Sequence, residues 1–334
     1  MDLSSRCGSL RVPDEYAQEY LSTKAGVALK PTTVETYDSQ LTEYTTYLNG
    51  KGKTSIAAEF SDIIEFLEEC VRRGNRRSTI CGKLSVIGEL YRYIRLRTDA
   101  GNQLNFDPLR FREINLDQYN VPEQIERDAL SKEEIRRLFD AFESYRNRLM
   151  AIVGVETGLR NSDIRSLRIN DVESDHVHVY APKNSKPYDV PISEQLSFEF
   201  DVWFKHHRPG FSAASESEYV FPSQQGAKLS QNSSLNSIIK EAADRAGIQD
   251  VIGKSTLSKE QQEVLGTDKE YCEWSRVTVH TLRHSYITLL GDAGVSLPYR
   301  QLVANHSDAA TTLGYTHDTE NVVDDIRSRY DPPR

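Results

Sequence analysis

The sequence predicts a mainly α-helical protein with one small β-hairpin, divided into two domains. Three observations support this fold class. Apolar residues recur at helical spacing through much of the first hundred residues, two alternating apolar–polar runs flank a short turn near residue 183, and a polar stretch with two prolines separates the halves. A chain of 334 residues is long enough to bury a core in each domain.

The N-terminal region, residues 12–100, is expected to form a helical domain of about four helices. Three apolar series in it repeat every three or four residues, the spacing of one helix face, and the second follows Ser61 and ends at Gly74. The three series are Val34, Tyr37, Leu41, Tyr44 and Leu48; Ile63, Phe66, Leu67, Cys70 and Val71; and Ile80, Leu84, Ile87, Tyr91 and Ile94.

A linker and a helix start are expected next. The stretch from 99 to 127 contains Asp-Ala-Gly-Asn, two prolines and mixed polarity, so residues 101–127 are predicted to be an extended linker. Ser131 and Glu134 then have the spacing of a capping box, in which each side chain bonds the other's backbone N–H. A second domain, residues 128–334, is therefore expected to begin here.

The first motif of the second domain is ETGLRNSDIRSL, residues 156–167. Gly158 predicts a tight turn, after which Arg160 opens a short helix with Asn161 or Ser162 as its N-cap. Asp163 follows Arg160 by three residues. Further on, HVHVYAPKNSKPYDVPI predicts a β-hairpin with Lys183 near its tip.

The most informative motif is HTLRH, residues 280–284. A helix over 281–293 would place His280 and Arg283 one turn apart on one face. The remaining stripe, Leu282, Tyr286, Leu289 and Ala293, has core spacing, and Gly294 is a natural end. The charged positions are then available for an anion such as a phosphate.

In chain order these motifs, with His306 and Tyr315 after them, supply Arg160, Lys183, His280, Arg283, His306 and Tyr315. In order and spacing the six positions resemble the catalytic domain of the tyrosine recombinases, the phage-integrase family of site-specific recombinases, and in particular the Xer-like members. The resemblance covers residues 128–320 well and the N-terminal third more loosely. It implies a helical, SAM-like core-binding domain at 12–100 and a mixed α/β catalytic domain at 128–334.

The resemblance also implies a role for each residue. Arg160 and Arg283 would hold the non-bridging phosphate oxygens through bidentate hydrogen bonds, with a further one from His306. Tyr315 would be the nucleophile, forming a 3′-phosphotyrosyl intermediate, with His280 as base and Lys183 as the acid for the departing 5′ oxygen. Lys186 is the alternative to Lys183. His284 and His317 fit the family pattern in supporting positions.

Charge patterning suggests where DNA would contact the N-terminal domain. The 41 basic and 50 acidic residues give a net charge of −9, which by itself does not favour DNA binding. Between residues 72 and 97, however, the sequence contains eight basic residues and only one acidic residue, Glu89. The six predicted to contact phosphate, called the basic strip below, are Arg72, Arg73, Arg76, Arg77, Lys83 and Arg92. A plain solvated helix face remains the alternative.

Composition and the resemblance together define the expected partners. The sequence contains no apolar run long enough for a membrane span, no signal peptide and no cysteine pattern of a disulfide framework, so a reduced cytoplasmic protein is expected. No metal site is expected, and the resemblance implies chemistry without metal or ATP. It also implies double-stranded DNA as substrate and a homotetramer on two DNA sites, with DNA-bending accessory proteins left open.

Three functions follow from this reading. The leading one is a site-specific recombinase that integrates or excises a virus, plasmid or genomic island. The alternatives are an Xer-type recombinase that resolves chromosome dimers and a non-catalytic DNA-binding protein of the same fold. Two features remain open: residues 249–276 form a longer segment than expected and carry no recognised motif, and residues 321–330 are expected to dock either on a neighbouring protomer or on their own domain.

Overall fold

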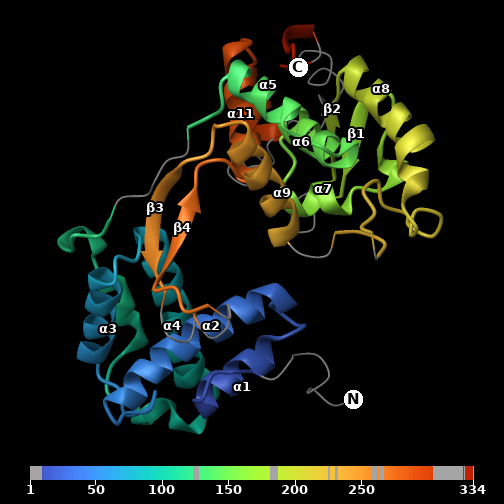
Figure 1. The fold of residues 1–334 in the computed structure, drawn as a ribbon. Coiled ribbons are helices and arrows are strands. Elements are labelled where there is room, and N and C mark those ends of the chain that lie inside the picture. The colour runs from blue at the N-terminus through green and yellow to red at the C-terminus, as the bar shows by residue number, and fades with distance from the viewer. Residues whose placement is uncertain are drawn as a thin grey trace. The chain divides into compact units, whose positions relative to one another are not determined.

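The computed structural model describes residues 10–122, 128–180, 187–224, 226–229, 232–257, 262, 267–303, 326 and 328–333. They form two compact units (Figure 1). The first unit contains Met1–Ile125 and Lys254–Glu273, and the second contains Glu126–Gly253 and Trp274–Arg334. The architecture is mainly helical with small two-stranded sheets, which confirms the predicted fold class.

The first unit is built on four helices. They are α1 (Glu15–Lys24), α2 (Pro31–Gly50), α3 (Phe60–Arg72) and α4 (Arg77–Arg97), and the last three correspond to the three predicted apolar series. In α4, Ile80, Ile87, Tyr91 and Ile94 are buried in the core of this unit, and Leu84 is partly buried against it. The hydroxyls of Tyr44 and Tyr91 hydrogen bond across the core at 2.6 Å, so α2 and α4 are joined by a polar contact as well as by packing.

The stretch after α4 differs from the extended linker that was predicted. It forms three short 3₁₀ turns, Asp99–Gln103, Pro108–Glu113 and Leu116–Gln118. Phe106 and Leu116 are buried in the core of the first unit, and the Phe106 ring lies 4.7 Å from the ring of Tyr91. Proline and polar content suggested a linker, whereas these apolar side chains attach the described part of the stretch to the helical unit.

The other elements of the second unit pack around α6, a helix that is almost fully buried. Its helices are α5 (Lys132–Asp140), α6 (Tyr145–Thr157), α7 (Asn161–Ser166), α8 (Glu194–Val202), α9 (Asn232–Arg245), α11 (Val279–Asp292) and α12 (Leu297–Val303). Short 3₁₀ turns cover Ile169–Asp171 and Arg208–Gly210, and a short π-helix covers Trp203–His207. In α6 every residue from Leu149 to Thr157 is buried. The predicted capping box is present at the start of α5, between Ser131 and Glu134.

Close packing of α6 on α11 organises this unit. Gly154 makes the approach possible, because a Cβ there would lie 3.1 Å from Leu282 Cδ1. The predicted stripe on α11 is buried at Leu282, Tyr286 and Leu289, and the helix ends just before Gly294, whose φ is 81°. The helix therefore buries its apolar face as its sequence predicts.

The strands form two separate small sheets. The predicted hairpin is present as β1 (His176–Val179) and β2 (Tyr188–Pro191), antiparallel, with Val179 opposite Tyr188 and Val177 opposite Val190. The long segment at 249–276 contributes β3 (Val251–Thr256) and β4 (Tyr271–Ser275), which pair with each other. An ion pair at 3.1 Å joins Lys254 of β3 to Glu273 of β4.

The C-terminal residues pack on their own domain where they are described. Ile326 is buried with Tyr286, Leu290 and Val303, and the Tyr330 hydroxyl donates to the carbonyl oxygen of Val155 at 3.3 Å. These contacts lie within the domain to which the residues belong, and residues 321–325 and 327 lie outside the described part of the chain. Among the helices of the described ranges, none is both long and apolar enough to cross a membrane.

Candidate active site

Gly158 creates the turn that presents Arg160. It ends α6 in the left-handed region, with φ 60°, and its N–H donates to Gly154. A Cβ at this position would collide with the ring of Tyr286, so only glycine fits the turn without strain. Arg160 follows as the N-cap of α7 and its side chain is exposed. The predicted N-cap, Asn161 or Ser162, is therefore displaced by Arg160 itself.

Arg283 is held against the same turn from the opposite helix. It lies in the second turn of α11, only 5% of its surface is exposed, and its Nη1 donates to the Gly158 carbonyl oxygen at 2.6 Å. A guanidinium carries five N–H donors, and this bond uses one of them. The TGLR turn and the LR of HTLRH, 125 residues apart in sequence, are thus joined directly.

The two arginines share one electrostatic environment. Burial and the neighbouring charge of Arg160 lower the pKa of Arg283, whereas Tyr188 and Asp163 raise it. Two guanidinium groups held near each other, one of them buried, repel unless an anion lies between them. The arrangement therefore suits a phosphate, to which planar guanidinium groups can donate in pairs.

Asp163 provides part of the compensating negative charge. It lies one turn after Arg160 on α7, and Ser162 Oγ donates to its Oδ1 at 3.1 Å. Burial raises the pKa of Asp163, while Ser162, Arg160 and Arg283 act to lower it. The sequence showed only the three-residue spacing from Arg160, which places the carboxylate on the arginine's side of the helix but does not reveal its proximity to Arg283.

His280 lies in the first turn of α11, three residues before Arg283, and its side chain is exposed. The structure therefore places Arg160, Arg283 and His280 on elements that meet at the Gly158 turn. The other predicted catalytic residues, Lys183, His306 and Tyr315, lie outside the described residues, as do Lys186 and His317.

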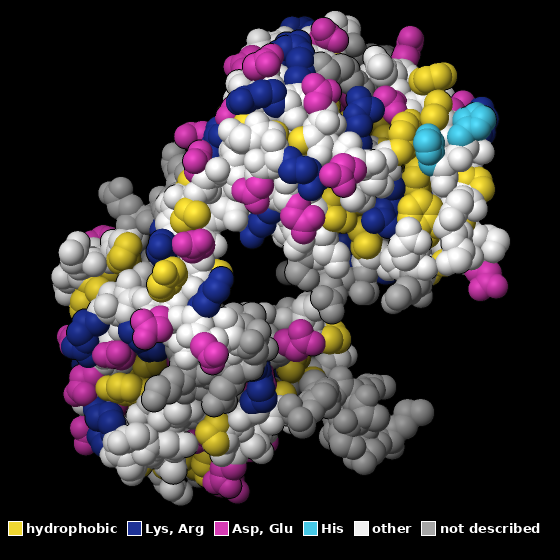
Figure 2. Space-filling model, viewed as in Figure 1, with side chains coloured by type: hydrophobic (Ala, Val, Ile, Leu, Met, Phe, Trp, Pro, Cys, Tyr) yellow, Lys and Arg dark blue, Asp and Glu magenta, His cyan; other side chains and the backbone are white. Residues whose placement is uncertain are grey.

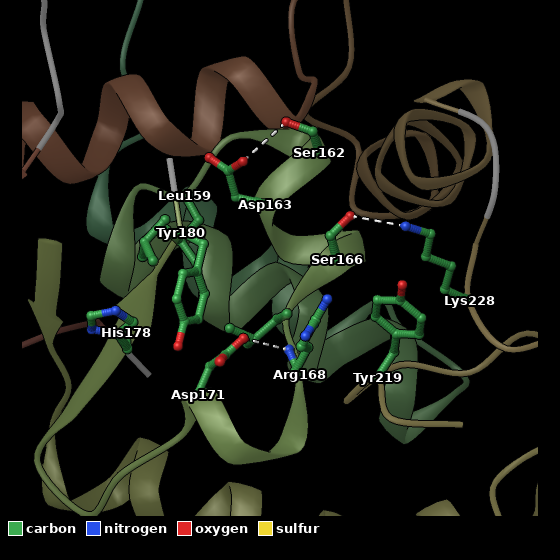
Figure 3. A pocket seen from close by; sticks show the side chains of 12 residues that line it. Leu159, Ser162, Asp163, Ser166, Arg168, Asp171, His178, Tyr180, Tyr219 and Lys228 are labelled. Atoms are coloured by element: carbon green, nitrogen blue, oxygen red, sulfur yellow. Dashed lines mark hydrogen bonds between the residues drawn. The ribbon is translucent and has the colours of Figure 1, made fainter. Parts of the chain in front are cut away.

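A pocket of about 510 Å³ adjoins this turn. It is lined by α7 and the turn after it, by the end of β1, and by Tyr219 and Lys228, as Figure 3 shows for Asp163, His178 and Lys228. Lys228 donates to Ser166 at 3.3 Å, and the backbone N–H of Arg168 donates to Asp171 at 2.9 Å. Over the described part of the chain, no three His, Cys, Asp or Glu side chains are grouped so that they could hold a metal ion.

The basic strip is on the first unit, and most of its charges already have acidic partners. Arg72 pairs with Glu69 at 2.9 Å, Arg73 with Glu43 at 2.9 Å, Arg77 with Asp117 at 2.7 Å, and Arg92 with Glu89. Figure 2 shows basic and acidic side chains interspersed over the visible face of the molecule. Arg76 is the N-cap of α4.

Lys83 differs from the other members of the basic strip. It is only 6% exposed, and its ammonium donates to Glu43 at 2.7 Å and to Asn75 at 2.6 Å. The same ammonium lies 6.0 Å from the centre of the Phe66 ring. Its surroundings are those of a buried ion pair joining α2, α4 and the turn after α3, and they do not suit a phosphate contact. Lys83 was expected to line the surface because sequence spacing alone does not separate the buried side of α4 from the exposed one.

Comparison with known protein families gives a match for each of the two units. The profile of the phage integrase family matches residues 128–321, and that of the phage integrase N-terminal SAM-like domain matches residues 14–98. All six predicted catalytic residues lie inside the first match.

Individual relatives extend over nearly the whole chain. The tyrosine recombinase XerD of Oceanobacillus iheyensis is 27% identical over 331 residues, covering 95% of this chain and 99% of that protein. XerD of Pasteurella multocida is 24% identical and covers 91% of this chain and 93% of that protein.

Solved structures show the same fold. A lambda integrase fragment (residues 75–356), crystallised as a dimer on a COC′ core site, has a TM-score of 0.64 at 15% identity over 89% of this chain and 95% of that one. The XerH recombinase bound to its difH substrate has a TM-score of 0.61 at 18% identity, covering 98% of this chain and 92% of that one.

Proposed function

This chain belongs to the phage integrase family of tyrosine recombinases, and we propose that it cuts and rejoins duplex DNA at one defined sequence through Tyr315. It is a tyrosine-type site-specific recombinase. In the proposed step the Tyr315 hydroxyl oxygen attacks the phosphorus and the bond to the 5′ oxygen breaks, which leaves a 3′-phosphotyrosyl link. A 5′-hydroxyl then attacks that link and releases the tyrosine. One phosphodiester replaces another in each step, so the bond energy is retained.

The observation that carries this proposal is the junction of Arg283 with the Arg160 turn. The guanidinium of Arg283 is buried, anchored on the Gly158 carbonyl oxygen and close enough to Arg160 for the two charges to repel. A scissile phosphate between them would relieve the repulsion and receive donors on its non-bridging oxygens, where negative charge grows as the nucleophile attacks. Removing either arginine should therefore slow cleavage more than it weakens DNA binding.

The remaining roles rest on the family resemblance and on the chemistry of each group. A phenol has a reference pKa of about 10, so Tyr315 requires a base, for which we propose His280. Lys183 at the hairpin tip would protonate the departing 5′ oxygen, and His306 would add a hydrogen bond to the phosphate. His280 suits its role because it is exposed in the first turn of the helix that carries Arg283.

We propose that the first unit contacts DNA through the basic strip, with Lys83 left out of that strip. Arg72, Arg77 and Arg92 are exposed. Arg73 and Arg76, next to Arg72 and Arg77 in the sequence, are partly exposed. The acidic partners of Arg72, Arg77 and Arg92 are also partly or largely exposed, so each of these three arginines can exchange a surface ion pair of small energy for a phosphate. Lys83, by contrast, is proposed to stabilise the helical unit.

We also propose a homotetramer on two DNA sites. The structural neighbours include lambda integrase as a dimer on a core site and as a tetramer on a Holliday junction. Because DNA is the substrate, we infer a cytoplasmic location, with which the free thiols of Cys70, Cys81 and Cys272 agree. The biological task that we propose is integration or excision of a virus, plasmid or genomic island.

The resolution of chromosome dimers is the second candidate. The near full-length likeness to recombinases named XerD favours an Xer-type role. The two tasks use the same chemistry, and the position of the target sequence in the genome distinguishes them: a single chromosomal site supports dimer resolution, and a site at the end of a mobile element supports integration.

Covalent capture tests the proposal. The full-length protein is incubated with fragmented DNA from its source, denatured in detergent, and the DNA that stays attached is sequenced, with Tyr315→Phe and Arg283→Ala in parallel. Adducts at one sequence that vanish in Tyr315→Phe and fall at least about 100-fold in Arg283→Ala are expected.

Other outcomes would redirect the proposal. Adducts that persist in Tyr315→Phe would exclude it as the nucleophile, and adducts at many unrelated sequences would indicate a topoisomerase. No adduct from a wild-type protein that still binds DNA would indicate the non-catalytic binder.

A further inference from the structure

Lys228 lines the pocket that adjoins the Arg160 turn (Figure 3). Its ammonium donates to Ser166 Oγ at 3.3 Å and lies 4.6 Å from the centre of the Tyr219 ring. Ser166 and Tyr219 line the pocket as well. An ammonium has three N–H donors, and the bond to Ser166 uses one of them. The hydroxyl and the ring therefore hold a positive charge at a defined place beside the pocket.

The segment that carries Lys228 is anchored on α7. Arg165 of α7 is buried, and its Nη1 donates to the carbonyl oxygen of Leu229 at 2.7 Å. The Nε of the same guanidinium donates to Asn161 Oδ1 at 2.8 Å, at the start of that helix. The residue next to Leu229 is Lys228, so its backbone has a fixed position relative to the helix that begins at Arg160.

The ion pairing of this pocket distinguishes Lys228 from the other basic side chains that line it. Arg168 pairs with Glu218 at 3.6 Å, and His178 Nδ1 lies 2.6 Å from Asp189 Oδ1. Lys228 forms no ion pair with any residue that the structure describes. Its charge is therefore not neutralised by the protein in the way that the charge of Arg168 is.

Two carboxylates also line the pocket, and both have partners other than Lys228. Asp171 is 6% exposed and accepts from the backbone N–H of Arg168 at 2.9 Å. Asp163 accepts from Ser162 at 3.1 Å and lies beside Arg160. Because these carboxylates do not pair with Lys228, an anion that enters the pocket from solution would find an ammonium with donors to offer.

The length of α7 indicates which anion this is. An α-helix rises about 1.5 Å per residue, so Ser166 lies about 9 Å along the helix from Arg160. Successive phosphates of one DNA strand are about 3.4 Å apart along the duplex axis. A duplex whose scissile phosphate is held by Arg160 is therefore expected to have another phosphate within reach of Lys228, at most about three nucleotides away.

Resting on the recombinase function proposed above, we propose that Lys228, together with the Ser166 hydroxyl, binds one backbone phosphate of the duplex beside the scissile phosphate. The ammonium supplies the charge, and the hydroxyl adds a neutral donor. Phosphate contacts fix the register of a protein on DNA without reading its sequence. This contact thus helps to determine which phosphate of the strand reaches Arg160, and Lys228 itself does not touch the reacting atoms.

Duplexes with one neutral phosphate test the contact. They carry the sequence found by covalent capture, and a methylphosphonate replaces one phosphate at a time within about three nucleotides on either side of the scissile one. Fluorescence anisotropy measures binding by the full-length protein. At one position we expect the methylphosphonate to weaken wild-type binding about tenfold, the effect of losing a hydrogen bond between charged groups.

Lys228→Gln should reproduce that loss on the natural duplex. Its affinity should be about tenfold lower than that of the wild type, and its salt slope should fall by about one. At the sensitive position it should bind the natural and the substituted duplex alike, because the contact is already absent. Lys228→Arg keeps the charge and should retain most of the affinity.

Two further variants serve as controls. Ser166→Ala removes only a neutral donor, so it should weaken binding about two- to fivefold and leave the salt slope unchanged. Lys205→Gln removes one positive charge from an exposed lysine of the same unit, whose partner is Asp201. It should remain as sensitive as the wild type to the methylphosphonate at the position that Lys228 contacts.

The outcomes separate this contact from the recombinase function. If Lys228→Gln and wild type are equally sensitive to every methylphosphonate, the contact is overturned even though the wild type cleaves the natural duplex. An unchanged salt slope in Lys228→Gln, or an equal loss of sensitivity in Lys205→Gln, would overturn it as well. A wild-type protein that forms no covalent adduct and binds all duplexes equally would refute the site-specific recombinase function, and the phosphate contact with it.

Discussion

Asp62 is a buried carboxylate whose charge is balanced by two lysines. Its side chain is 1% exposed, with Lys51 at 2.5 Å and Lys53 at 2.7 Å, and it also accepts from the backbone N–H of Glu59 at 2.8 Å. Burial by itself would raise the pKa of Asp62, but Lys51, Lys53 and the backbone donor lower it to about 2. A carboxylate with a lowered pKa stabilises the folded state above its unfolded pKa, near 4, and this contribution is lost as the pH falls toward 2.

Asp62→Asn should therefore lower the free energy of unfolding of the first unit by about 2 kcal/mol at pH 6, and by progressively less between pH 4 and pH 2. Urea unfolding followed by circular dichroism at several pH values measures this. Glu65→Gln, which removes a more exposed partner of Lys51, is the control and should have a small effect at every pH. A difference between Asp62→Asn and wild type that stays constant from pH 6 to pH 2 would refute the assignment.

Asp163 is the residue whose charge we expect to matter most beside the two arginines. Asp163→Asn keeps the size of the side chain but removes the anion that offsets Arg160 and Arg283 in the free protein. Single-turnover cleavage should slow about tenfold, while DNA binding stays equal or tightens because a negative charge has left the phosphate site. Asp163→Glu should recover most of the rate. Weaker DNA binding by Asp163→Asn would show that the carboxylate has a different role.

At the residue scale, the sequence identified the arginines because each lies in a short motif whose spacing defines a helix face. Neither motif reveals that Arg283 would be anchored on the Gly158 carbonyl, since that bond joins positions 125 residues apart. Cross-element contacts of this kind set the geometry of the site, and they appear only when the core is assembled.

Among the structural elements, the turn between α6 and α7 is under the tightest steric constraint. Gly158 has a positive φ, and a methyl group there would collide with Tyr286. Gly158→Ala should lower the free energy of unfolding of the second unit by about 2–4 kcal/mol, the sum of left-handed strain and overpacking. Denaturant unfolding followed by tryptophan fluorescence reports on this unit because Trp203 is buried in its core.

Gly294→Ala is the control for that prediction. Its φ is 81°, but a Cβ there would meet no atom within 4 Å, so it should lose only about 1–2 kcal/mol from strain. Equal losses at Gly158 and Gly294 would mean that the ring of Tyr286 moves aside freely. Because the Gly158 carbonyl anchors Arg283, we also expect Gly158→Ala to slow DNA cleavage, whereas Gly294→Ala should leave the rate unchanged.

Prediction of the elements from sequence succeeded where one face of a helix is apolar or where a capping box marks its start. The helices α2, α3, α4 and α11 and the capping box of α5 follow that rule. The stretch 101–121 was not predicted correctly, because Phe106, between two 3₁₀ turns, and Leu116, within a third, are buried without forming a periodic pattern. The β3–β4 sheet was also missed, since its strands are largely exposed and lack the alternation of a half-buried sheet.

On the scale of the whole molecule, the acidic residues that give the net charge of −9 also form ion pairs with the arginines proposed to contact DNA. The arginines of the basic strip lie within reach of acids that are distant in sequence, such as Glu43 for Arg73 and Asp117 for Arg77. Sequence charge counts could not reveal this pairing. It implies that the acids compete with phosphate for the strip, so DNA binding by this protein is weaker than its arginines alone would allow.

Asp117→Asn tests the competition. Asp117 is 70% exposed and pairs with Arg77 at 2.7 Å, and removing its charge leaves the arginine free for phosphate. The affinity for a non-specific duplex should rise up to about fivefold, the limit set by a surface ion pair. Fluorescence anisotropy over a series of potassium chloride concentrations measures both the affinity and its salt slope.

Two further variants separate the effect of the Arg77–Asp117 ion pair from the effect of the net charge. Asp201→Asn changes the net charge equally but lies in the second unit, where its partner is Lys205, and should raise the affinity much less. In an Arg77→Gln background the effect of Asp117→Asn should largely disappear, because no arginine remains to be released, and the salt slope should fall by about one. If Asp117→Asn and Asp201→Asn raise the affinity for DNA equally, only the net charge matters. If Asp117→Asn raises the affinity as much in the Arg77→Gln background as in the wild type, the ion pair does not control access of DNA to the basic strip.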